Sequence, residues 1–478
     1  MPDFQLNEQL NNLIDQWQEA IIADTQKLIA INSEYREGGG PGQPFGPQIA
    51  EALDAVLELA GGMGFVTRNV DGYMGEIDLG DPVQGKKIGM IAHIDVVPAG
   101  DGWDYPPFAG QVAAGKLYGR GSADDKGPLV ASLYAMKAVK ESGLPCRNHA
   151  RYLIGTDEES GFRCIKYYLT KEEQPWGGFS PDGEFPVIYG EKGTYRFKCV
   201  QQWPAAAQTG DNQDRFTIIQ VKGGTRMNVV PEYASAALSG NESLYALAEA
   251  ALVADNPEGR LRLSRAGQNL FIEARGISAH AATPWFGLSA NNQLLNFLRR
   301  LPLSPAPAEN YLHALADLFA DGHLGAAAGL ACTIEDFGPL TVSLGILEAG
   351  PEGGSASFDL RYPNLEQREE LWRNIVQAFA KRRLPVALLQ DKPGLLVPKD
   401  SFLIQSLLQA YQQTSGRDEG PVTIGGGTYC RALNNFVAYG PLFPGQRELA
   451  HERNEYILVD DLILCAKIYT QALYNLMK

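Results

Sequence analysis

The amino-acid sequence predicts an α/β fold whose chain is interrupted by a long α+β insertion. In residues 1–190, and again in 392–478, short apolar runs of strand length alternate with helical patterns. Between them, residues 191–391 mix strands of alternating polarity with helices, which is typical of an α+β domain. Because 478 residues are too many for one hydrophobic core, we expect a discontinuous main domain, formed by the two outer segments, and a separate inserted domain.

The first outer segment carries the strongest strand patterns. NEQLNNLIDQWQEAIIADTQKLIAI predicts an acidic amphipathic helix, and a second helix is expected near residues 47–60, before short strands at 64–70 and 75–79. KKIGMIAH and ARYLIGT predict buried strands, and GPLVASLYAMKAVKESG between them predicts a helix that ends at a glycine. Open α/β sheets bind ligands outside the carboxyl ends of their strands, so we expect a site after these two runs.

The insertion has the β-α-β order of a ferredoxin-like domain, and its length has room for two copies. Its predicted strands are FTIIQVKGG, NLFIEARG, LTVSLGILEAG and GSASFDLRYP. Its predicted helices are SLYALAEAALVADN, LSANNQLLNFLRRL and LEQREELWRNIVQAFAKRR. The last segment returns to α/β character with the helix SFLIQSLLQAYQQTSG, the strand PVTIGGG and the helix VDDLILCAKIYTQALYNLMK.

The composition excludes several classes of function. Hydrophobic residues make up 45% of the chain and charged residues 20%, as in an ordinary globular protein. The net charge of −15 argues against nucleic acid and anionic membranes as partners, and no apolar run reaches membrane-spanning length. The six cysteines are scattered without a C-x-x-C pair, which disfavours a thiolate zinc site and suits the cytoplasm.

Polar residues that can bind metal gather in a few short segments: AHIDVVP, GRGSADDKG, IGTDEESG, SPDGEFP and, near the C-terminus, AHERNE. The candidates in them are His93, Asp95, Asp124, Glu158, Glu159, Asp182 and His451. Together they supply ligands for two divalent metals and leave one carboxylate over. Hydrolysis uses such a carboxylate to take a proton from water that metals have acidified.

Each segment also has a simpler interpretation. Alternation places His93 and Asp95 on one face of an extended segment, where Asp95 could orient the ring, but a surface histidine at a strand end is equally compatible. One aspartate of the Asp124-Asp125 pair could bridge two metals, while the other is expected to be a helix N-cap. In SPDGEFP, Asp182 could simply form an Asp-Gly turn.

The adjacent pair Glu158-Glu159 is the sharpest signal among these segments. Two glutamates at the end of a buried strand repel each other unless a cation is present, and a solvated loop is the alternative. Taken alone, His451 lies in an unremarkable polar loop. In GISAHAATPWFG, His280 stands at a strand-to-helix turn whose small neighbours let a substrate approach closely.

The segments H-x-D, G-x-G-x-x-D-x-K-G, T-D-E-E and G-x-x-A-H occur in one order along the chain. In that order they resemble the di-zinc superfamily of aminoacylase, acetylornithine deacetylase, succinyl-diaminopimelate desuccinylase and glutamate carboxypeptidase, over nearly the whole chain. Within it, the chain is most similar to the PepV-type dipeptidases. The similarity lies in GQPFG, WDYPPFAGQVAAGKLYGRGSADDKGP, PDGEFPVIYGEKG, GGTRMNVVPE and the insertion 191–391.

The resemblance implies a zinc-peptidase-like three-layer α/β/α catalytic domain with an inserted α+β lid, ferredoxin-like and doubled. It implies two zinc ions per chain, with manganese or cobalt as alternatives. The implied metal ligands are His93, Asp124 as the bridge, Glu159, Asp182 and His451. Glu158 matches the general base, and Asp95 matches the residue that orients His93.

The implied substrate-binding residues are Asn228, His280, Arg361, Gly425, Gly426 and Gly427. By resemblance, His280 would polarise the scissile carbonyl and stabilise its oxyanion, and Arg361 would hold the substrate carboxylate. Without the resemblance, Arg361 reads as a solvent-facing strand arginine.

The expected function is metal-dependent hydrolysis of dipeptides with free amino and carboxyl ends. The alternatives are an N-acyl amino acid deacylase or a carboxypeptidase with the same metals. A metal-dependent binding protein is another class, which the spare carboxylate of Glu158 disfavours. We expect a cytoplasmic monomer that acts on small peptides, because a long insertion gives His280 room to serve its own chain.

Overall fold

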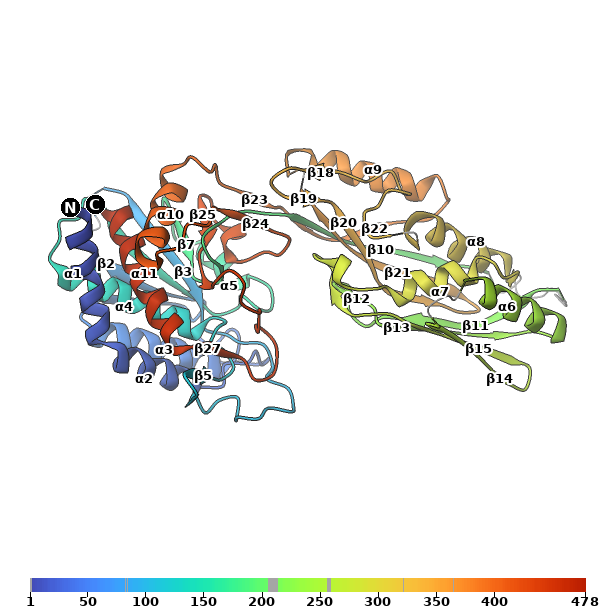
Figure 1. Ribbon diagram of the computed structural model, residues 1–478, viewed down its shortest axis with the longest axis horizontal. Coiled ribbons are helices and arrows are strands. Elements are labelled where there is room, and N and C mark those ends of the chain that lie inside the picture. The colour runs from blue at the N-terminus through green and yellow to red at the C-terminus, as the bar shows by residue number, and fades with distance from the viewer. Residues whose placement is uncertain are drawn as a thin grey trace. The chain divides into compact units, whose positions relative to one another are not determined.

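The computed structural model describes residues 2–81, 83, 85–204, 214–255, 259–320, 322–363 and 365–478. The chain forms two compact units (Figure 1). The first unit comprises Met1–Gly190, Leu396–Thr423 and Gly427–Lys478, and the second comprises Glu191–Leu395 and Ile424–Gly426. The first unit is mixed α/β and is formed by the two outer parts of the chain, and the second unit is formed mainly by the segment inserted between them.

The first unit begins with helices and then alternates strands with helices. Up to the insertion its elements are α1 Pro2–Gln16, α2 Gln18–Ile29, α3 Pro47–Gly62, β1 Val66–Val70, β2 Met74–Leu79, β3 Lys87–His93, β4 Gln111–Ala113, β5 Lys116–Tyr118, α4 Lys126–Ser142, β6 His149–Gly155, α5 Arg163–Tyr168, β7 Gly177–Ser180, β8 Gly183–Glu184 and β9 Ile188–Glu191. After the insertion they are β23 Leu395–Leu396, α10 Phe402–Ser415, β24 Val422–Ile424, the 3-10 helix η5 Tyr429–Ala432, β25 Phe436–Ala438, β26 Pro441–Leu442, β27 Tyr456–Leu458 and α11 Val459–Met477.

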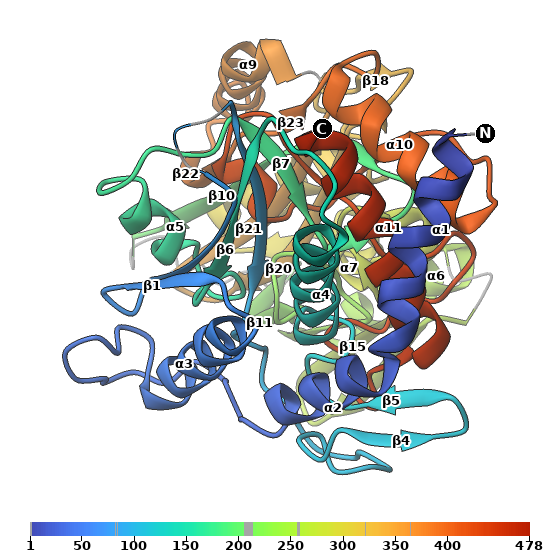
Figure 2. The ribbon, with the colours of Figure 1, turned by 90° about the vertical axis from the view of Figure 1, so that its left-hand side faces the viewer.

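The main sheet of the first unit runs in the order β1-β2-β6-β3-β7-β25-β9, with β6, β3, β7 and β25 parallel to one another. Helices cover both of its faces. Successive residues of a strand point to opposite faces, and Tyr152 of β6 donates to the carbonyl of Leu129 on α4, whereas Arg151 reaches the hydroxyl of Tyr168 on α5. Helices α1, α4 and α11 pack against one another on the α4 side (Figure 2).

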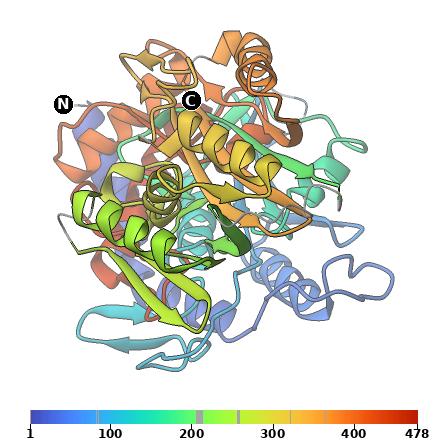
Figure 3. The same ribbon diagram turned by 90° about the vertical axis from the view of Figure 1, so that its right-hand side faces the viewer.

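The second unit is built on one continuous, almost wholly antiparallel sheet in the order β14-β15-β13-β11-β20-β21-β10-β22. Its strands are β10 Gly193–Gln202, β11 Phe216–Gly223, β12 Val229–Val230, β13 Tyr233–Ser239, β14 Leu261–Ala266, β15 Asn269–Arg275, β16 Ala279–His280, β17 Leu303–Ser304, β18 Thr333–Ile334, β19 Gly338–Pro339, β20 Thr341–Ala349, β21 Gly353–Tyr362 and β22 Ala387–Lys392. Its helices are α6 Glu242–Asp255, η2 Pro284–Phe286, α7 Ala290–Leu298, α8 Ala306–Leu315, η3 Ala316–Ala320, η4 Leu365–Gln367 and α9 Arg368–Ala380, and α6 to α8 are drawn green to yellow in Figure 3.

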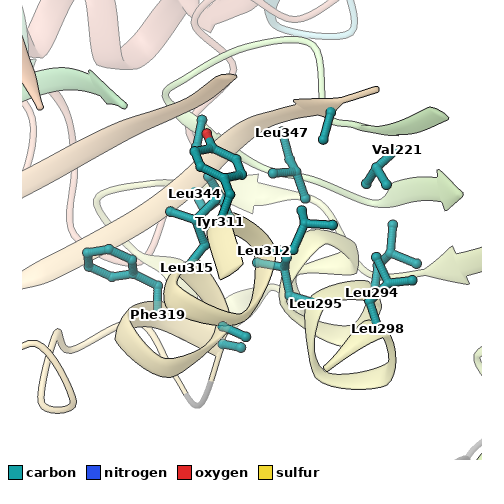
Figure 4. Close-up of a cluster of buried hydrophobic side chains, with 14 of the residues drawn as sticks. Val221, Leu294, Leu295, Leu298, Tyr311, Leu312, Leu315, Phe319, Leu344 and Leu347 are labelled. Carbon is teal, nitrogen blue, oxygen red and sulfur yellow. The ribbon is translucent and has the colours of Figure 1, made fainter. Parts of the chain in front are cut away.

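The core of the second unit lies between its sheet and its helices. Along β13 and β15, buried residues alternate with partly or fully exposed ones, so one face of these strands is apolar and covered. Helix α7 contacts β13, β15 and β20, and α8 contacts β21. Figure 4 shows the resulting cluster, in which Leu294 and Leu298 of α7 and Tyr311 of α8 lie with Leu344 and Leu347 of β20.

The helix predicted at the N-terminus is divided in the structure. Helix α1 ends at Gln16 and α2 begins at Gln18, because Trp17 leaves helical geometry with φ −111° and ψ 12°. None of the helices in the described part of the chain has both the length and the apolar character needed to cross a membrane.

Candidate metal centre and active site

Three neighbouring parallel strands of the first unit deliver acidic residues and a histidine to one edge of the sheet. His93 is the last residue of β3 and pairs with Gly155, the last residue of β6. Glu158 and Glu159 follow β6, and Asp182 follows β7 on the other side of β3. The carboxyl ends of these strands therefore bring together residues that the sequence predicted to form a site.

Two loops add Asp124 and His451 to this edge. Asp124 lies just before α4, in a cis peptide with Asp125, and His451 lies before β27 with φ 67°. One carboxylate oxygen of Asp124, Oδ1, is 2.9 Å from Nε2 of His93, and the other, Oδ2, is 3.2 Å from Nε2 of His451. The two oxygens of a single carboxylate thus face two different histidines, as a carboxylate that bridges two metals would.

Glu159 and Asp182 extend the cluster on opposite sides of Asp124. Oε2 of Glu159 lies 3.1 Å from Nε2 of His451, and Oδ2 of Asp182 lies 3.9 Å from Nε2 of His93. Ligand atoms of His93, Asp124 and Glu159 all lie within 4.8 Å of one another. The contacts divide the residues into two sets that share Asp124: one with His93 and Asp182, the other with His451 and Glu159.

The chemistry of this donor set fits divalent cations. Nδ1 of His93 donates a hydrogen bond to the carbonyl of Asp95 at 2.9 Å, which directs the lone pair of a neutral ring at Nε2. A lone pair and a carboxylate oxygen 2.9 Å apart repel each other unless a proton or a cation lies between them. Imidazole nitrogen and carboxylate oxygen are ligands that zinc accepts.

The carboxyl groups of the cluster shift one another's pKa values. Burial, followed by the charge of Asp124, raises the pKa of Asp182 to about 7, and the same two causes raise the pKa of Glu159. Burial opposes ionisation of Asp124 as well, but hydrogen bonds from the rings of His451 and His93, when these are protonated, outweigh it and hold the pKa of Asp124 well below its usual range. Carboxyl groups that lie this close together ionise together only when cations offset the repulsion between their negative charges.

Glu158 does not share the side-chain contact that its neighbour Glu159 makes with His451. Burial, together with the charges of Asp182 and Glu159, raises the pKa of Glu158 well above its ordinary value, although His93 opposes this shift. Its backbone N–H donates to Oδ1 of Asp95 at 3.1 Å, so the main chain at this position is fixed independently of the side chain. A partly buried carboxyl group with a raised pKa beside a candidate metal site is suited to accept and release a proton.

Asp95 and Asp125 hold the main chain of the site. The carboxylate of Asp95 accepts hydrogen bonds from the backbone N–H groups of Glu158 and Glu159, both at 3.1 Å. The acceptor nearest to Nδ1 of His93 is the Asp95 carbonyl at 2.9 Å, whereas the Asp95 carboxylate lies at 3.6 Å. Asp125 occupies the N-cap position of α4, but its carboxylate accepts from the backbone N–H of His93 at 3.2 Å and caps no helical N–H.

The residues expected to bind substrate lie in the second unit, apart from Gly427. His280 lies in β16, opposite Val229 of β12, and the carbonyl of Asn228 accepts from the backbone N–H of Ala281 at 2.9 Å. These pairings hold Asn228 and His280 in one local structure.

Arg361 is buried, at 5% exposure, where the sequence alone suggested an arginine that faces solvent. Its Nε donates to Asp359 at 2.6 Å, its Nη2 to the same carboxylate at 3.2 Å, and its Nη1 to the carbonyl of Gly425 at 3.1 Å. These contacts use three of the five N–H groups of a guanidinium. Gly425 and Gly426 belong to the second unit and Gly427 to the first.

Sequence reasoning missed Arg120 and Glu455, a buried ion pair with Nη1 to Oε2 at 2.6 Å. Oε1 of Glu455 accepts from the backbone N–H groups of Gly121, Ala123 and Asp124. Glu455 is the last residue of the AHERNE segment. The one feature of the sequence that could have drawn attention to it is its position as a charged residue directly before the apolar run YIL.

The family model of Peptidase family M20/M25/M40 matches residues 89–475. A protein of Bacillus subtilis (strain 168), "Putative dipeptidase YtjP", is 35% identical over 464 residues, which cover 96% of this chain and 98% of that one. A protein of Staphylococcus saprophyticus, "Putative dipeptidase SSP1012", is 34% identical over 471 residues, with coverage of 97% and 98%.

Solved structures share the fold at low sequence identity. Human carnosine dipeptidase 1 superposes with a TM-score of 0.58 at 15% identity and covers 98% of both chains. Aminoacylhistidine dipeptidase from Vibrio alginolyticus gives 0.59 at 13% identity, with 96% of this chain and 97% of that one covered. From the family match and the full-length relatives, the chain belongs to peptidase family M20/M25/M40.

Proposed function

We propose that this protein is a metal-dependent dipeptidase that hydrolyses the peptide bond of dipeptides with free amino and carboxyl ends. The observation that carries the proposal is the convergence of His93, Asp124, Glu159, Asp182 and His451 in a chain of family M20/M25/M40. Full-length similarity to proteins that are named as dipeptidases supports the choice of substrate.

Two divalent cations would be held by the residue sets that share Asp124. His93 and Asp182 would complete one set, and His451 and Glu159 the other, in agreement with the contacts of the two Asp124 oxygens. Zinc suits imidazole and carboxylate ligands, and manganese or cobalt accepts the same donors. Divalent cations in such a site lower the pKa of water and polarise a carbonyl group.

Glu158 would act as the general base and then as the general acid. Its carboxylate would take the proton of the attacking water and would later deliver it to the nitrogen of the leaving amine. Asp95 would keep Glu158 and His93 in place, through its carboxylate and its carbonyl respectively.

Residues of the second unit would bind the substrate. Arg361 would hold the substrate carboxylate with its remaining N–H groups, because a guanidinium matches a carboxylate bidentately, and the turn Gly425-Gly426-Gly427 would supply backbone groups near it. His280 would stabilise the oxyanion, and Asn228, which is tied to the same segment, would bind beside it.

We further propose a cytoplasmic monomer. None of the six cysteines, all within the described residues, forms a disulfide, as is usual in a reducing compartment. An insertion with its own core and continuous sheet offers room for His280 to serve its own chain. Light scattering coupled to activity at increasing dilution tests this, since activity that falls as a dimer dissociates would contradict a monomer.

The function is tested by metal analysis combined with an activity assay. We expect the purified protein to bind two zinc ions per chain, to hydrolyse dipeptides, to lose that activity on dialysis against a chelator, and to regain it when zinc is restored. Full activity in chelated protein that analysis shows to be free of metal would refute a metal-dependent reaction.

A further inference from the structure

A carboxylate outside the proposed ligand set holds the loop that carries Asp124. Glu455 is fully buried and lies one residue before β27, which pairs with β5 so that Tyr456 is opposite Tyr118. The backbone N–H of Gly119, just after β5, donates to the carbonyl of Glu455 at 3.0 Å. The pairing of two short strands thus fixes the backbone of Glu455 against the loop that leads to Asp124.

The side chain of Glu455 organises that loop. Its Oε1 accepts hydrogen bonds from the backbone N–H groups of Gly121 at 3.0 Å, Ala123 at 2.9 Å and Asp124 at 3.1 Å. Gly121 has φ +88°, a conformation that favours glycine and that helps these N–H groups to converge on one oxygen. The conformation of the segment 121–124 is therefore built around a residue 331 positions away in the sequence.

The second oxygen of Glu455 is neutralised by a buried cation. Nη1 of Arg120 donates to Oε2 at 2.6 Å, and Arg120 itself is 1% exposed, with its guanidinium 5.2 Å from the ring centre of Trp103. The pair therefore adds no net charge to a site that already holds an excess of carboxylates. A neutral apolar residue at 455 would leave both the arginine and three backbone donors without their acceptor.

Glu455 also lies close in sequence to a proposed ligand, since His451 is four residues earlier in the same loop. His451 and Asp124 face each other, with Nε2 and Oδ2 3.2 Å apart. The carboxylate of Glu455 holds the main chain of Asp124, and its own main chain ends the loop that carries His451. Glu455 thus connects the main chain of Asp124 with the end of the loop that carries His451.

We propose that Glu455 is a positioning residue for the metal centre, which presets the distance between Asp124 and His451 and thereby the affinity for the cation that they share. The inference rests on the metal site of the proposed function. Removal of residues that orient metal ligands typically weakens metal binding by about 10–100-fold. The geometry predicts a loss in this range for Glu455→Ala and a smaller loss for Glu455→Gln, whose amide oxygen can still accept from the three N–H groups.

The experiment measures zinc dissociation constants of the full chain by competition with a chromophoric chelator, at a temperature where every variant is folded by circular dichroism. The absorption spectrum of the cobalt-substituted protein reports the ligand geometry independently of activity. Glu76→Ala is a matched control, because Glu76 is a buried carboxylate of the same unit that accepts from Arg68 and Arg151, both at 2.5 Å, away from the cluster.

We expect Glu455→Ala to weaken zinc binding and to alter the cobalt spectrum, and Glu76→Ala to lower thermal stability without either change. Equal zinc affinities and spectra for Glu455→Ala and Glu76→Ala would overturn the proposal and leave Glu455 a purely structural role. Should Glu455→Ala fail to fold, an unchanged zinc affinity in Glu455→Gln would overturn it. A wild-type chain that binds no zinc would instead refute the proposed function itself.

Discussion

The two adjacent glutamates provide the sharpest test of the assigned roles. The backbone N–H groups of both glutamates donate to the carboxylate of Asp95 at 3.1 Å, but only the side chain of Glu159 contacts Nε2 of His451, at 3.1 Å. Replacing Glu158 with Ala therefore removes a proton acceptor without disturbing the main chain or a ligand. We expect both metals to remain bound, while kcat/KM for a dipeptide falls by about 10²–10⁴-fold, the usual contribution of a general acid–base group.

This loss corresponds to about 3–5 kcal/mol of transition-state stabilisation, at about 1.36 kcal/mol per tenfold change in rate. The assay pairs initial rates with the zinc content of the same preparation, for Glu158→Ala, Glu158→Gln and Glu159→Ala. Only Glu159→Ala should lose metal. If Glu158→Ala lost a metal ion and Glu159→Ala kept both, the two roles would be reversed.

Three other outcomes follow from buried contacts. Asp359→Asn should lower the free energy of unfolding by about 3–5 kcal/mol in urea titrations, because it leaves the buried Arg361 without its charge partner; an unchanged unfolding curve would contradict this. In the folded, chelated protein the pKa of Asp182 is raised to about 7 from an ordinary value of 3.8, so the free energy of unfolding should fall as the pH rises between these two values. Saturating zinc should abolish this pH dependence. A free energy of unfolding that rises with pH in the chelated protein would refute the assignment. Ser401→Ala should cost about 1 kcal/mol of stability, because its hydroxyl caps α10, and it should leave turnover unchanged.

Much of the fold could be predicted because its strands and helices have simple patterns. The strands predicted from KKIGMIAH and ARYLIGT are β3 and β6, and the helix between them is α4, since continuous apolar runs mark strands that are covered on both faces. Strand β10 was not predicted, because Arg196 and Lys198 interrupt its apolar pattern. The structure explains Arg196, whose Nε donates to the buried carboxylate of Asp359 at 2.9 Å.

The residues that gather at this sheet edge could be named from the sequence, but the contacts that support them could not. His93 and Glu159 follow strong strand signals, so their position at one sheet edge could be inferred, and their roles as ligands stay predictions. The pairing of Arg120 with Glu455 joins residues 335 positions apart, and no local pattern indicates such a contact. The position of Asp95 in the sequence likewise did not show that its carbonyl is the nearer acceptor for His93.

The central claim is that a metal centre hydrolyses dipeptides whose two ends are both free. The most direct measurement compares initial rates of the zinc-loaded protein on a dipeptide, its C-terminal amide, its N-acetyl form and a tetrapeptide of the same residues. We predict rapid hydrolysis of the dipeptide alone. The amide should react more slowly, because it lacks the carboxylate that would bind the charged Arg361, and losing that hydrogen bond costs about 1.5–3 kcal/mol of binding free energy. A preference for the N-acetyl form would indicate a deacylase, and equal rates on all four substrates would indicate a broader peptidase; either result would contradict this account.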